Sequence, residues 1–467
     1  MTPRSLAVAL CLSIPLGAGM PLTAPAAESD GLVGTGRLDA GTVDFLGDTL
    51  GSFSSLQVRD WRRVGDGYEG VLWTLPDRGR NDPEARLFYD YSARLHRFRV
   101  RFTPADGRVT LEPDGGLVLR DFDGQPFTGA DPGKGTQVQQ GLLLPSPHEG
   151  IGAGKVSLDA ESLQFTADGG FYVGDEYAAN VYYFDPQGRL RGVIQPPPAV
   201  APYRDGQPDF GSLRPPQTGR RNNQGVEGMS LSPDGRTLFV VLQSALMQDS
   251  ADDGHKGRRS TRVLVYDVSQ DPMPTAPVRH HVVQLPVYRD AGDAGKPDRT
   301  AAQSEIRALD GHRFLMLSRD GAGLGSESNV PVVYKRILLV DTHEATNLAG
   351  TVYETGTESV LQRRKDTALR PGIRPAAWTE LVDMLDPVEL ARVDLVPEQL
   401  SEKWEAMDLV SVLDPAAPED YFLFVGNDND FIARQCTMAG QRCDSPLDND
   451  SRVLVYRLTL PGYSPGP

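Results

Sequence analysis

The sequence lacks the short signatures of the common hydrolases. No G-x-S-x-G, H-E-x-x-H, Walker or complete EF-hand sequence occurs, and the run from Gly228 to Ser232 only approaches the first of these. Histidine is scarce, with seven in 467 residues: His148 lies in a Gly/Pro-rich loop, and His280 and His281 lie in an expected outer strand. A serine-type esterase mechanism therefore has no visible catalytic set.

Long apolar runs are absent after the N-terminus, so we expect no transmembrane segment. Hydrophobic residues at 39% and charged residues at 24% are ordinary for a soluble globular protein. The formal net charge of −16 excludes a general nucleic-acid binder, which needs a basic face to displace counterions. We expect a monomer that binds small molecules.

The N-terminus predicts export. Arg4 precedes an apolar run from Leu6 to Ile14, and small residues follow up to Ala26 and Ala27. A basic start, a short apolar stretch and an Ala-x-Ala end are typical of a secretory signal peptide. We therefore predict a signal peptide over residues 1–26, cleavage near Ala26 and a periplasmic or secreted protein, with one domain over 27–467.

Only three cysteines occur, and Cys11 falls within the predicted signal peptide. The remaining two, Cys436 and Cys443, predict a disulfide, because an exported chain with an even number of cysteines usually pairs them. A ring this small would hold one loop rather than the whole fold. Two free thiols are the alternative.

Glycine (49 residues) and proline (37 residues) are plentiful and spread along the chain, as expected for many short strands joined by turns. Five units combine β-rich runs, several of them with Asp-Gly turns, such as Asp168-Gly169 and Asp234-Gly235. Such turns predict hairpins, because glycine accepts a positive φ. In four units an acidic residue opens the first strand: Glu161, Glu227, Glu305 and Glu405.

These repeats predict an all-β propeller of five or six four-stranded blades, because ring closure removes the exposed edges that an open stack would leave. Residues 105–150 could hold a sixth blade, or a strand near Leu32–Leu38 could close the ring with the last blade. Outer strands are expected after Leu190, Val278 and Thr351. The region 357–402 is expected to be a partly helical insertion, with helical periodicity from Ala376 to Val393.

Three short runs resemble one family. Asp77-Arg-Gly79, Asp175-Glu-Tyr177 and Asn223-Gln-Gly-Val-Glu-Gly228 are similar to motifs of the exported bacterial phytase-like family, the "esterase-like activity of phytase" family. The resemblance covers roughly residues 40–460. It implies a propeller distantly similar to calcium-dependent phytases, in which acidic side chains at one mouth hold calcium ions that bind phosphate esters.

The predicted mouth is rich in carboxylates. In an antiparallel hairpin the start of one strand lies beside the end of the next, so both sets of acids fall on one edge. Calcium takes six to eight oxygen ligands, and crowded carboxylates repel one another unless a cation or proton intervenes. We expect calcium, with these candidate ligands: Asp159, Glu161, Asp175, Glu176, Glu227, Glu305, Asp320, Glu405 and Asp428. Backbone hydrogen bonding across the blade interface is the alternative role of each acid.

Arginines at the same edge predict anion binding, because a guanidinium grips phosphate oxygens in a bidentate way. We expect Arg78, Arg319 and Glu227 in catalysis, and Asp77, Arg78, Tyr177 and Asn223 at the substrate. The function expected is calcium-dependent hydrolysis of a phosphate ester by activated water. A non-catalytic propeller with structural calcium and a carboxylesterase are the alternatives, and each arginine could instead form a structural ion pair.

Overall fold

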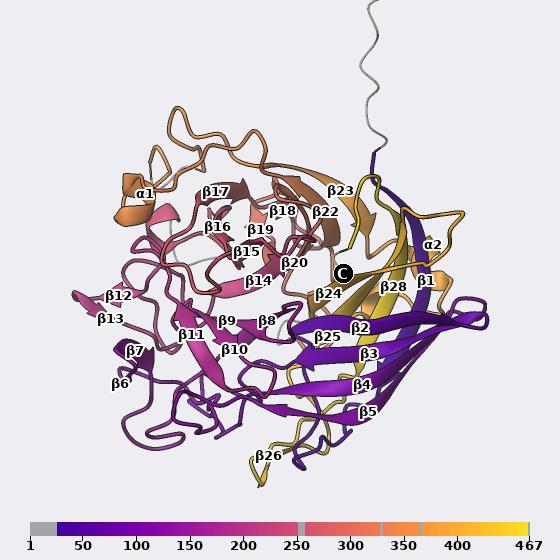
Figure 1. The fold of residues 1–467 in the computed structure, drawn as a ribbon, viewed down its shortest axis with the longest axis horizontal. Helices are drawn as coiled ribbons and strands as arrows, with labels where there is room; N and C mark the ends of the chain where they lie inside the picture. The colour runs from indigo at the N-terminus through magenta and orange to yellow at the C-terminus, as the bar shows by residue number, and fades with distance from the viewer. Residues whose placement is uncertain (1–25, 251–256, 327–329, 364–366, 466–467) are drawn as a thin grey trace, which may run out of the picture.

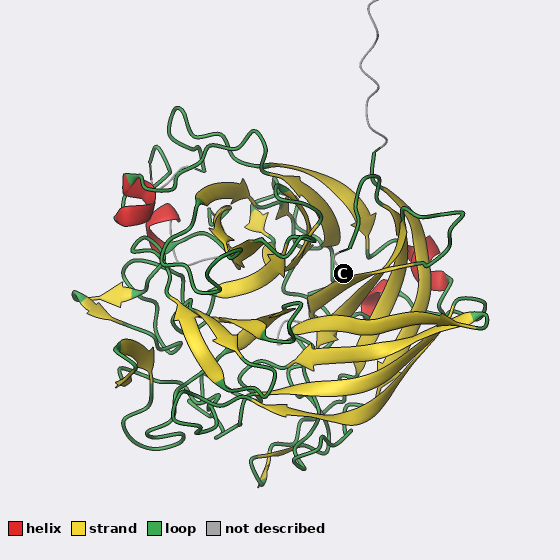
Figure 2. Ribbon diagram, viewed as in Figure 1, coloured by secondary structure: helices red, strands yellow, loops and turns green. Residues whose placement is uncertain are grey.

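The computed structural model describes residues 26–250, 257–326, 330–363 and 367–465, so the predicted signal peptide lies almost wholly outside the described residues. The described chain is built from strands, loops and a few short helices (Figure 2). Most strands fall into five four-stranded antiparallel blades, within the predicted range of five or six. The predicted β-propeller is therefore confirmed.

Three blades are continuous in sequence, and each is ordered from its inner to its outer strand. Blade two consists of β8 (Ala160–Phe165), β9 (Phe171–Asp175), β10 (Val181–Phe184) and β11 (Leu190–Ile194). Blade three consists of β14 (Val226–Leu231), β15 (Thr237–Leu242), β16 (Ser260–Asp267) and β17 (Arg279–Gln284). Blade four consists of β20 (Ala302–Ala308), β21 (Arg313–Arg319), β22 (Lys335–Asp341) and β23 (Ala377–Asp383).

The remaining two blades meet at their outer strands. Blade one consists of β2 (Ser55–Val64), β3 (Gly67–Leu75), β4 (Arg94–Thr103) and β5 (Arg108–Val118). Blade five consists of β24 (Lys403–Ser411), β25 (Asp420–Asp428), β28 (Ser451–Thr459) and β1 (Glu28–Leu38). Strand β1 pairs with β28 along its length and touches β5 at Thr35, so the N-terminal strand closes the ring, one of the two predicted arrangements.

Short elements decorate the connections between strands. The remaining strands form hairpins: β6 (Thr136–Gln139) with β7 (Leu142–Pro145), β12 (Tyr203–Arg204) with β13 (Gln207–Pro208), β18 (Val287–Tyr288) with β19 (Arg299–Thr300), and β26 (Thr437–Met438) with β27 (Gln441–Arg442). The helices are short: η1 (Met247–Asp249), α1 (Val352–Thr355), α2 (Pro387–Ala391) and η2 (Pro397–Gln399). Residues 105–150, all of which are described, contain β5 and the two-stranded β6–β7 hairpin, so this region holds no sixth blade.

Two predictions around blade four were wrong. The segment after Thr351 forms the short helix α1, and the outer strand of the blade lies later, at β23. The expected helical stretch from Ala376 to Val393 is helical only over α2, because Ala377–Asp383 pairs with β22 as the edge of the sheet. An edge strand packs against a single neighbour, so its exposed residues can imitate a helical pattern.

The five inner strands form a closed ring. Each contacts the next in the order β2, β8, β14, β20, β24 and back to β2, and their labels surround a common centre in Figure 1. Apolar side chains fill the interfaces between blades, and the interface between blades one and five contains Phe53, Phe98, Phe102 and Phe424. Carboxylates that begin different inner strands therefore meet around one axis.

Hydrogen bonds from backbone amides to side-chain acceptors tie neighbouring inner strands together. The amide nitrogens of Phe165, Leu231, Ala308 and Val58 donate to side chains of the adjacent inner strand, at 2.6 Å to Gln57, 3.1 Å to Gln164, 2.9 Å to Ser230 and 2.7 Å to Asp408. The step between β20 and β24 is an ion pair instead, with Arg307 Nη2 2.5 Å from Asp408 Oδ1. The ring is therefore closed by polar contacts as well as by apolar packing.

Replacing Asp408 should destabilise this closure strongly. In Asp408→Asn the buried Arg307 would lose its countercharge, and leaving one member of a buried ion pair alone costs about 3–5 kcal/mol. Denaturant unfolding should show this loss, whereas the matched control Asp39→Asn removes a carboxylate that is 78% exposed and should change stability by less than about 1 kcal/mol. Equal stability of the two variants would contradict the assigned role of the ion pair.

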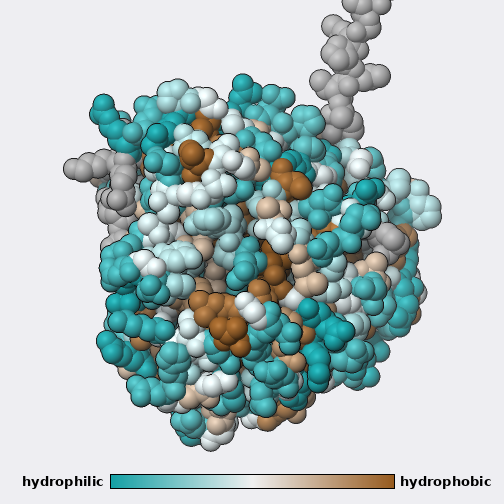
Figure 3. Space-filling view, turned by 60° about the vertical axis from the view of Figure 1, so that its left-hand side comes forward, coloured by the Kyte–Doolittle hydropathy of each residue, from teal (hydrophilic) through white to brown (hydrophobic). Residues whose placement is uncertain are grey.

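The surface carries few large apolar features. Figure 3 shows a face that is mostly hydrophilic, with small separate hydrophobic patches. No helix in the described part of the chain is long and apolar enough to cross a bilayer. Cys436 and Cys443 form the predicted disulfide, which closes the loop around the β26–β27 hairpin.

Candidate metal centre

Three glutamates lie at matching irregularities of the inner strands. In β8 the pairing with β9 skips Glu161, in β14 the pairing with β15 skips Glu227, and in β24 the pairing with β25 skips Glu405. A β-bulge leaves its extra residue out of the ladder and redirects the side chain. The same device in three blades therefore places three carboxylates at one mouth of the ring.

Blade four differs from this pattern by one residue. Its bulge skips Ser304, and Glu305 comes one position later. The Glu305 carboxylate accepts hydrogen bonds from Ser55 Oγ at 2.6 Å, Ile306 N at 2.8 Å and Met229 N at 3.2 Å. A shift of one residue along a strand turns a side chain to the other face. The Glu305 carboxylate therefore lies inside the ring of inner strands, reaching Met229 of blade three and Ser55 of the non-adjacent blade one, and burial raises its pKa to about 8.

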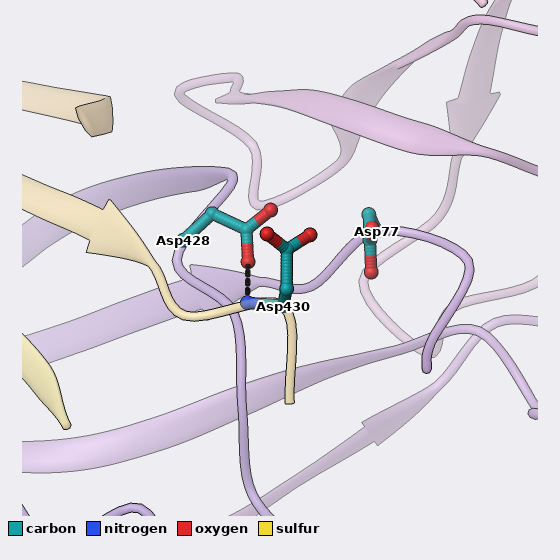
Figure 4. A group of neighbouring side chains, drawn as sticks. All are labelled: Asp77, Asp428 and Asp430. Atoms are coloured by element: carbon teal, nitrogen blue, oxygen red, sulfur yellow. Dashed lines mark hydrogen bonds between the residues drawn. The ribbon is translucent and has the colours of Figure 1, made fainter. Parts of the chain in front are cut away.

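Two groups of three carboxylates share Asp77, which follows the end of β3. Asp77, Asp159 and Glu161 form one group, and Asp77, Asp428 and Asp430 form the other; in each, one oxygen from every residue lies within 4.8 Å of the others. Figure 4 shows the Asp430 carboxylate between those of Asp428 and Asp77. Strand ends from blades one, two and five meet here.

Three further acids extend the cluster toward blades three and five. Burial raises the pKa of Glu227 well above its usual value, and the charges of Glu176 and Glu405 raise it further. The pKa of Glu161 is raised by burial and, in decreasing order, by the charges of Glu227, Glu176, Asp159 and Glu405. We call the whole cluster the acidic mouth; its members are Asp77, Asp159, Glu161, Glu176, Glu227, Glu405, Asp428 and Asp430.

Cations contact the acidic mouth but are outnumbered. Arg78 Nη1 lies 3.0 Å from Asp159, Lys403 Nζ lies 2.6 Å from Asp430 and 3.3 Å from Asp428, and Arg319 pairs with Glu405. The eight buried or nearly buried carboxylates thus outnumber the cations around them, even with the buried Arg220, whose charge acts on Glu176. Lys403 lowers the pKa of Asp428 against the effect of burial, while burial raises those of Asp159 and Glu405 to about 7. The remaining negative charge requires protons or bound cations.

Several carboxylate oxygens in the acidic mouth have no hydrogen-bond donor among the described residues. They are both oxygens of Asp159, whose contact with Arg78 is close but poorly aligned, and one oxygen each of Glu176 and Glu227. A buried acceptor without a partner costs free energy, which a bound ion would recover. Clustered carboxylate oxygens are the donors that calcium and magnesium prefer, so this residue set fits a hard divalent cation.

Two predicted ligands are occupied by the protein itself. Asp175 accepts hydrogen bonds from the backbone nitrogens of Ala178, Tyr177 and Asp159 at 2.7 to 3.2 Å. Asp320 accepts from the nitrogens of Val333 and Tyr334 at 2.7 and 2.9 Å and pairs with the buried Lys335 at 3.0 Å. Both side chains hold the loops that frame the mouth.

The predicted catalytic and substrate residues lie beside these acids. Arg78 also donates to Ser212 Oγ at 2.9 Å, and its guanidinium lies 5.7 Å from the ring centre of Tyr177. Arg319 donates to Ser304 Oγ at 3.0 Å in addition to its ion pair. The Tyr177 hydroxyl is buried and donates to Gly129 O at 2.8 Å, whereas the Asn223 side-chain oxygen is buried without a partner among the described residues.

Sequence reasoning missed two cations at this mouth. Lys403 begins β24, and its position two residues before the anchor glutamate Glu405 was the available signal. Arg220 is fully buried and donates to the backbone carbonyls of Tyr177, Phe210, Gly211 and Arg221. It fixes the loop after Glu176, and the Arg220-Arg221 pair before Asn222 was its only trace in the sequence.

Comparison with known proteins gives one family. The family model described as "Phytase-like: Esterase-like activity of phytase" matches residues 49–431. An "Uncharacterized secreted protein" of Arthroderma benhamiae is 33% identical over 463 residues, covering 88% of each chain.

Solved structures are only distantly similar. The PQQ-bound form of aldose sugar dehydrogenase from Streptomyces coelicolor has 12% identity and a TM-score of 0.31, covering 93% of this chain and 100% of that one. YCF48 bound to D1 peptide has 9% identity and a TM-score of 0.26, covering 95% of this chain and 100% of the other. Likeness at this level carries no argument about chemistry.

Proposed function

The chain belongs to the phytase-like family, esterase-like activity of phytase, and on that premise we propose that its acidic mouth binds calcium and hydrolyses phosphate esters. The observation that carries the proposal is Asp77, a buried carboxylate shared by two groups of three acids. Such a group is strongly unfavourable without cations, and it lies where three blades present their strand ends.

The residues that would hold cations follow from the two groups. Asp77, Asp159 and Glu161 would hold one ion, and Asp77, Asp428 and Asp430 a second. The partnerless oxygen of Glu176 lies in the same cluster and could help to complete a coordination sphere of six to eight oxygens. Asp175, Glu305 and Asp320 are assigned to support, because donors within the protein already occupy them.

The bound cations would supply charge for the phosphate oxygens and a water of lowered pKa as nucleophile. The chain's own residues would orient the ester. Arg78 and Arg319, from blades one and four, would grip phosphoryl oxygens and stabilise the charge that develops on them. Lys403 would hold Asp428 and Asp430 in place. Glu227, whose pKa is raised by burial, would give a proton to the leaving oxygen.

One observation favours a non-catalytic alternative. Arg78, Arg319 and Lys403 are each already paired with an acid of the mouth, which would suit a propeller that binds a ligand while calcium serves stability. A carboxylesterase has no comparable support, because no histidine in the described chain hydrogen-bonds to a serine side chain.

Chromogenic substrates distinguish these functions. We expect the protein to hydrolyse a phosphate monoester or diester of p-nitrophenol with calcium and to lose that activity in a chelator. Glu227→Gln should lower the rate by about 100-fold, the usual contribution of a general acid, while Glu149→Gln in an exposed loop should not. Turnover of p-nitrophenyl acetate alone, or phosphate-ester hydrolysis that resists the chelator, would overturn the proposal.

We also infer that the protein is exported and acts outside the cytoplasm. The N-terminal sequence has the features of a signal peptide, the disulfide suits an oxidising compartment, and the relative from Arthroderma benhamiae is named a secreted protein. Calcium is more abundant in such surroundings than in cytosol, which suits sites of moderate affinity.

A further inference from the structure

A cavity lies at the mouth of the ring opposite the acidic mouth. It has a volume of about 610 Å³, within the range of small-molecule sites. Its walls come from the distal parts of all five inner strands and from the C-terminal tail. We call it the far cavity; the lining residues used below are Arg59, Trp61, Phe165, Arg307, Asp408 and Tyr463.

The far cavity is separate from the acidic mouth. Phe165 ends β8, four residues after Glu161, and a strand advances about 3.3 Å per residue, so the two sites lie roughly 13 Å apart along this strand. The C-terminal tail reaches the cavity through Tyr463 and Pro465. A ligand here would leave the cation-binding carboxylates untouched.

Aromatic walls of the far cavity are held rigidly. The Trp61 ring stacks on Tyr68 with ring centres 5.2 Å apart, and its indole nitrogen donates to Ser411 O at 3.0 Å. Phe165 packs against Trp73 and Phe171. Preformed aromatic surfaces of this kind suit a flat apolar body and lose little conformational entropy on binding.

Arg59 brings an uncommitted charge into this cavity. Its guanidinium lies 4.8 Å from the centre of the Phe165 ring, and within the described chain it makes no hydrogen bond and no ion pair. A guanidinium stacked on a ring keeps its N–H edge available for a bidentate acceptor. The cavity therefore presents an aromatic face and a cationic edge at one place.

Arg307 adds a second donor from the floor of the cavity. It donates to Gln164 Oε1 at 2.9 Å and pairs with Asp408, but its buried Nε has no partner among the described residues. The Asp408 oxygens are taken by Arg307 and by the backbone nitrogens of Val58 and Leu409. Arg59 and the Nε of Arg307 therefore remain as donors in the lining of the cavity, while the lining acids Asp60 and Asp234 are exposed to solvent.

We propose that the far cavity binds a small aromatic carboxylate, with its ring against Trp61 and Phe165 and its carboxylate at Arg59 and Arg307. This site goes beyond the hydrolytic function proposed above and uses none of the residues of the acidic mouth. Its occupant is defined by a flat apolar body and a single negative charge.

Calorimetric titration with three probes of equal size tests the proposal: 1-naphthoate, neutral 1-naphthylmethanol and cationic 1-naphthylmethylamine. We expect one naphthoate to bind per chain, more tightly than either other probe. Arg59→Gln should weaken naphthoate binding by about tenfold or more, the usual loss for a hydrogen bond to a charged group, and leave the neutral probe unchanged. Arg62→Gln, on the same strand but 62% exposed and paired with Glu69, is the matched control.

The same titration can overturn the proposal. No saturable binding, equal binding of the acid and the alcohol, tighter binding of the amine, or equal effects of Arg59→Gln and Arg62→Gln would each do so. Naphthoate affinity should be the same with calcium and with a chelator. That independence separates this proposal from the hydrolytic one, since either can fail without the other.

Discussion

With divalent cations removed by a chelator, the melting temperature should fall as the pH rises from about 5 to about 8. Burial raises the pKa of Asp159, Asp175 and Glu405 to about 7 and that of Glu305 to about 8. Each of these carboxyls holds a proton in the folded protein that the unfolded chain releases near pH 4. Their contribution to stability is therefore complete below that pH and is lost as the pH passes through 7 to 8.

The size of the fall should be several degrees. A pKa raised from 3.8 to about 7, as for Asp159, corresponds to about 4 kcal/mol of stability lost on full ionisation. His280 acts in the opposite direction, because burial lowers its pKa to about 4, so its effect on stability ends near pH 6.5. Four carboxyls outweigh this one imidazole across the upper part of the range.

Calcium should reverse part of the fall, because it would bind the ionised carboxylates of the acidic mouth, Asp159 and Glu405 among them, and compete with protons there. Differential scanning calorimetry should show a large rise in melting temperature on adding calcium at about pH 8 and a small one at about pH 5. Asp159→Asn, which cannot ionise, should give a shallower pH dependence in the chelator. A melting temperature independent of pH in the chelator, or equal stabilisation by calcium at both pH values, would contradict this explanation.

Replacement of Asp77 by asparagine should have the largest effect of any single change in the acidic mouth. Asp77 belongs to both groups of three carboxylates, so Asp77→Asn would weaken both proposed cation sites at once. We expect calcium affinity to fall by about 100-fold and phosphate-ester hydrolysis to fall by at least as much. Calcium titration and steady-state kinetics would measure the two effects.

The melting temperature of Asp77→Asn should distinguish it from other variants of the acidic mouth. Burial and the charges of Asp428, Asp159 and Asp430 raise the pKa of Asp77 well above its usual value, so removing the carboxyl should stabilise the cation-free protein near neutral pH. The variant should melt higher than the parent in a chelator and gain little from calcium. Asp82→Asn, an exposed acid nearby in the same loop, should behave as the parent does. A variant that keeps calcium stabilisation would refute the shared role.

The blades were predictable because their signals are local. Asp-Gly turns and apolar runs of strand length identified the hairpins, and in the structure Gly235 has a φ of 69°. Strand β23 was missed because it is an edge strand that follows a long connection, with an irregular burial pattern. Short-range periodicity cannot identify a strand whose position depends on pairing with β22 from far back in the chain.

The candidate site was predictable only in its position. Strand starts and strand ends predicted that the acids gather on one edge, and Asp77, Asp159, Glu161 and Asp428 do lie together. The one-residue offset of Glu305 depends on where the bulge falls in β20, which no local pattern specifies. The self-contained hydrogen bonding of Asp175 and Asp320 depends on the path of the following loops.

The closure of blade five links the two ends of the chain. Strand β1 is sandwiched between β28 and β5, so the first and last strands of the described fold hold each other in the same sheet. While a ribosome or export channel still holds the last strand, β28 cannot pair with β1 and the ring of blades stays open. The acids of blades one and five then stay apart. Assembly of the acidic mouth should therefore be a late event that follows delivery of the whole polypeptide.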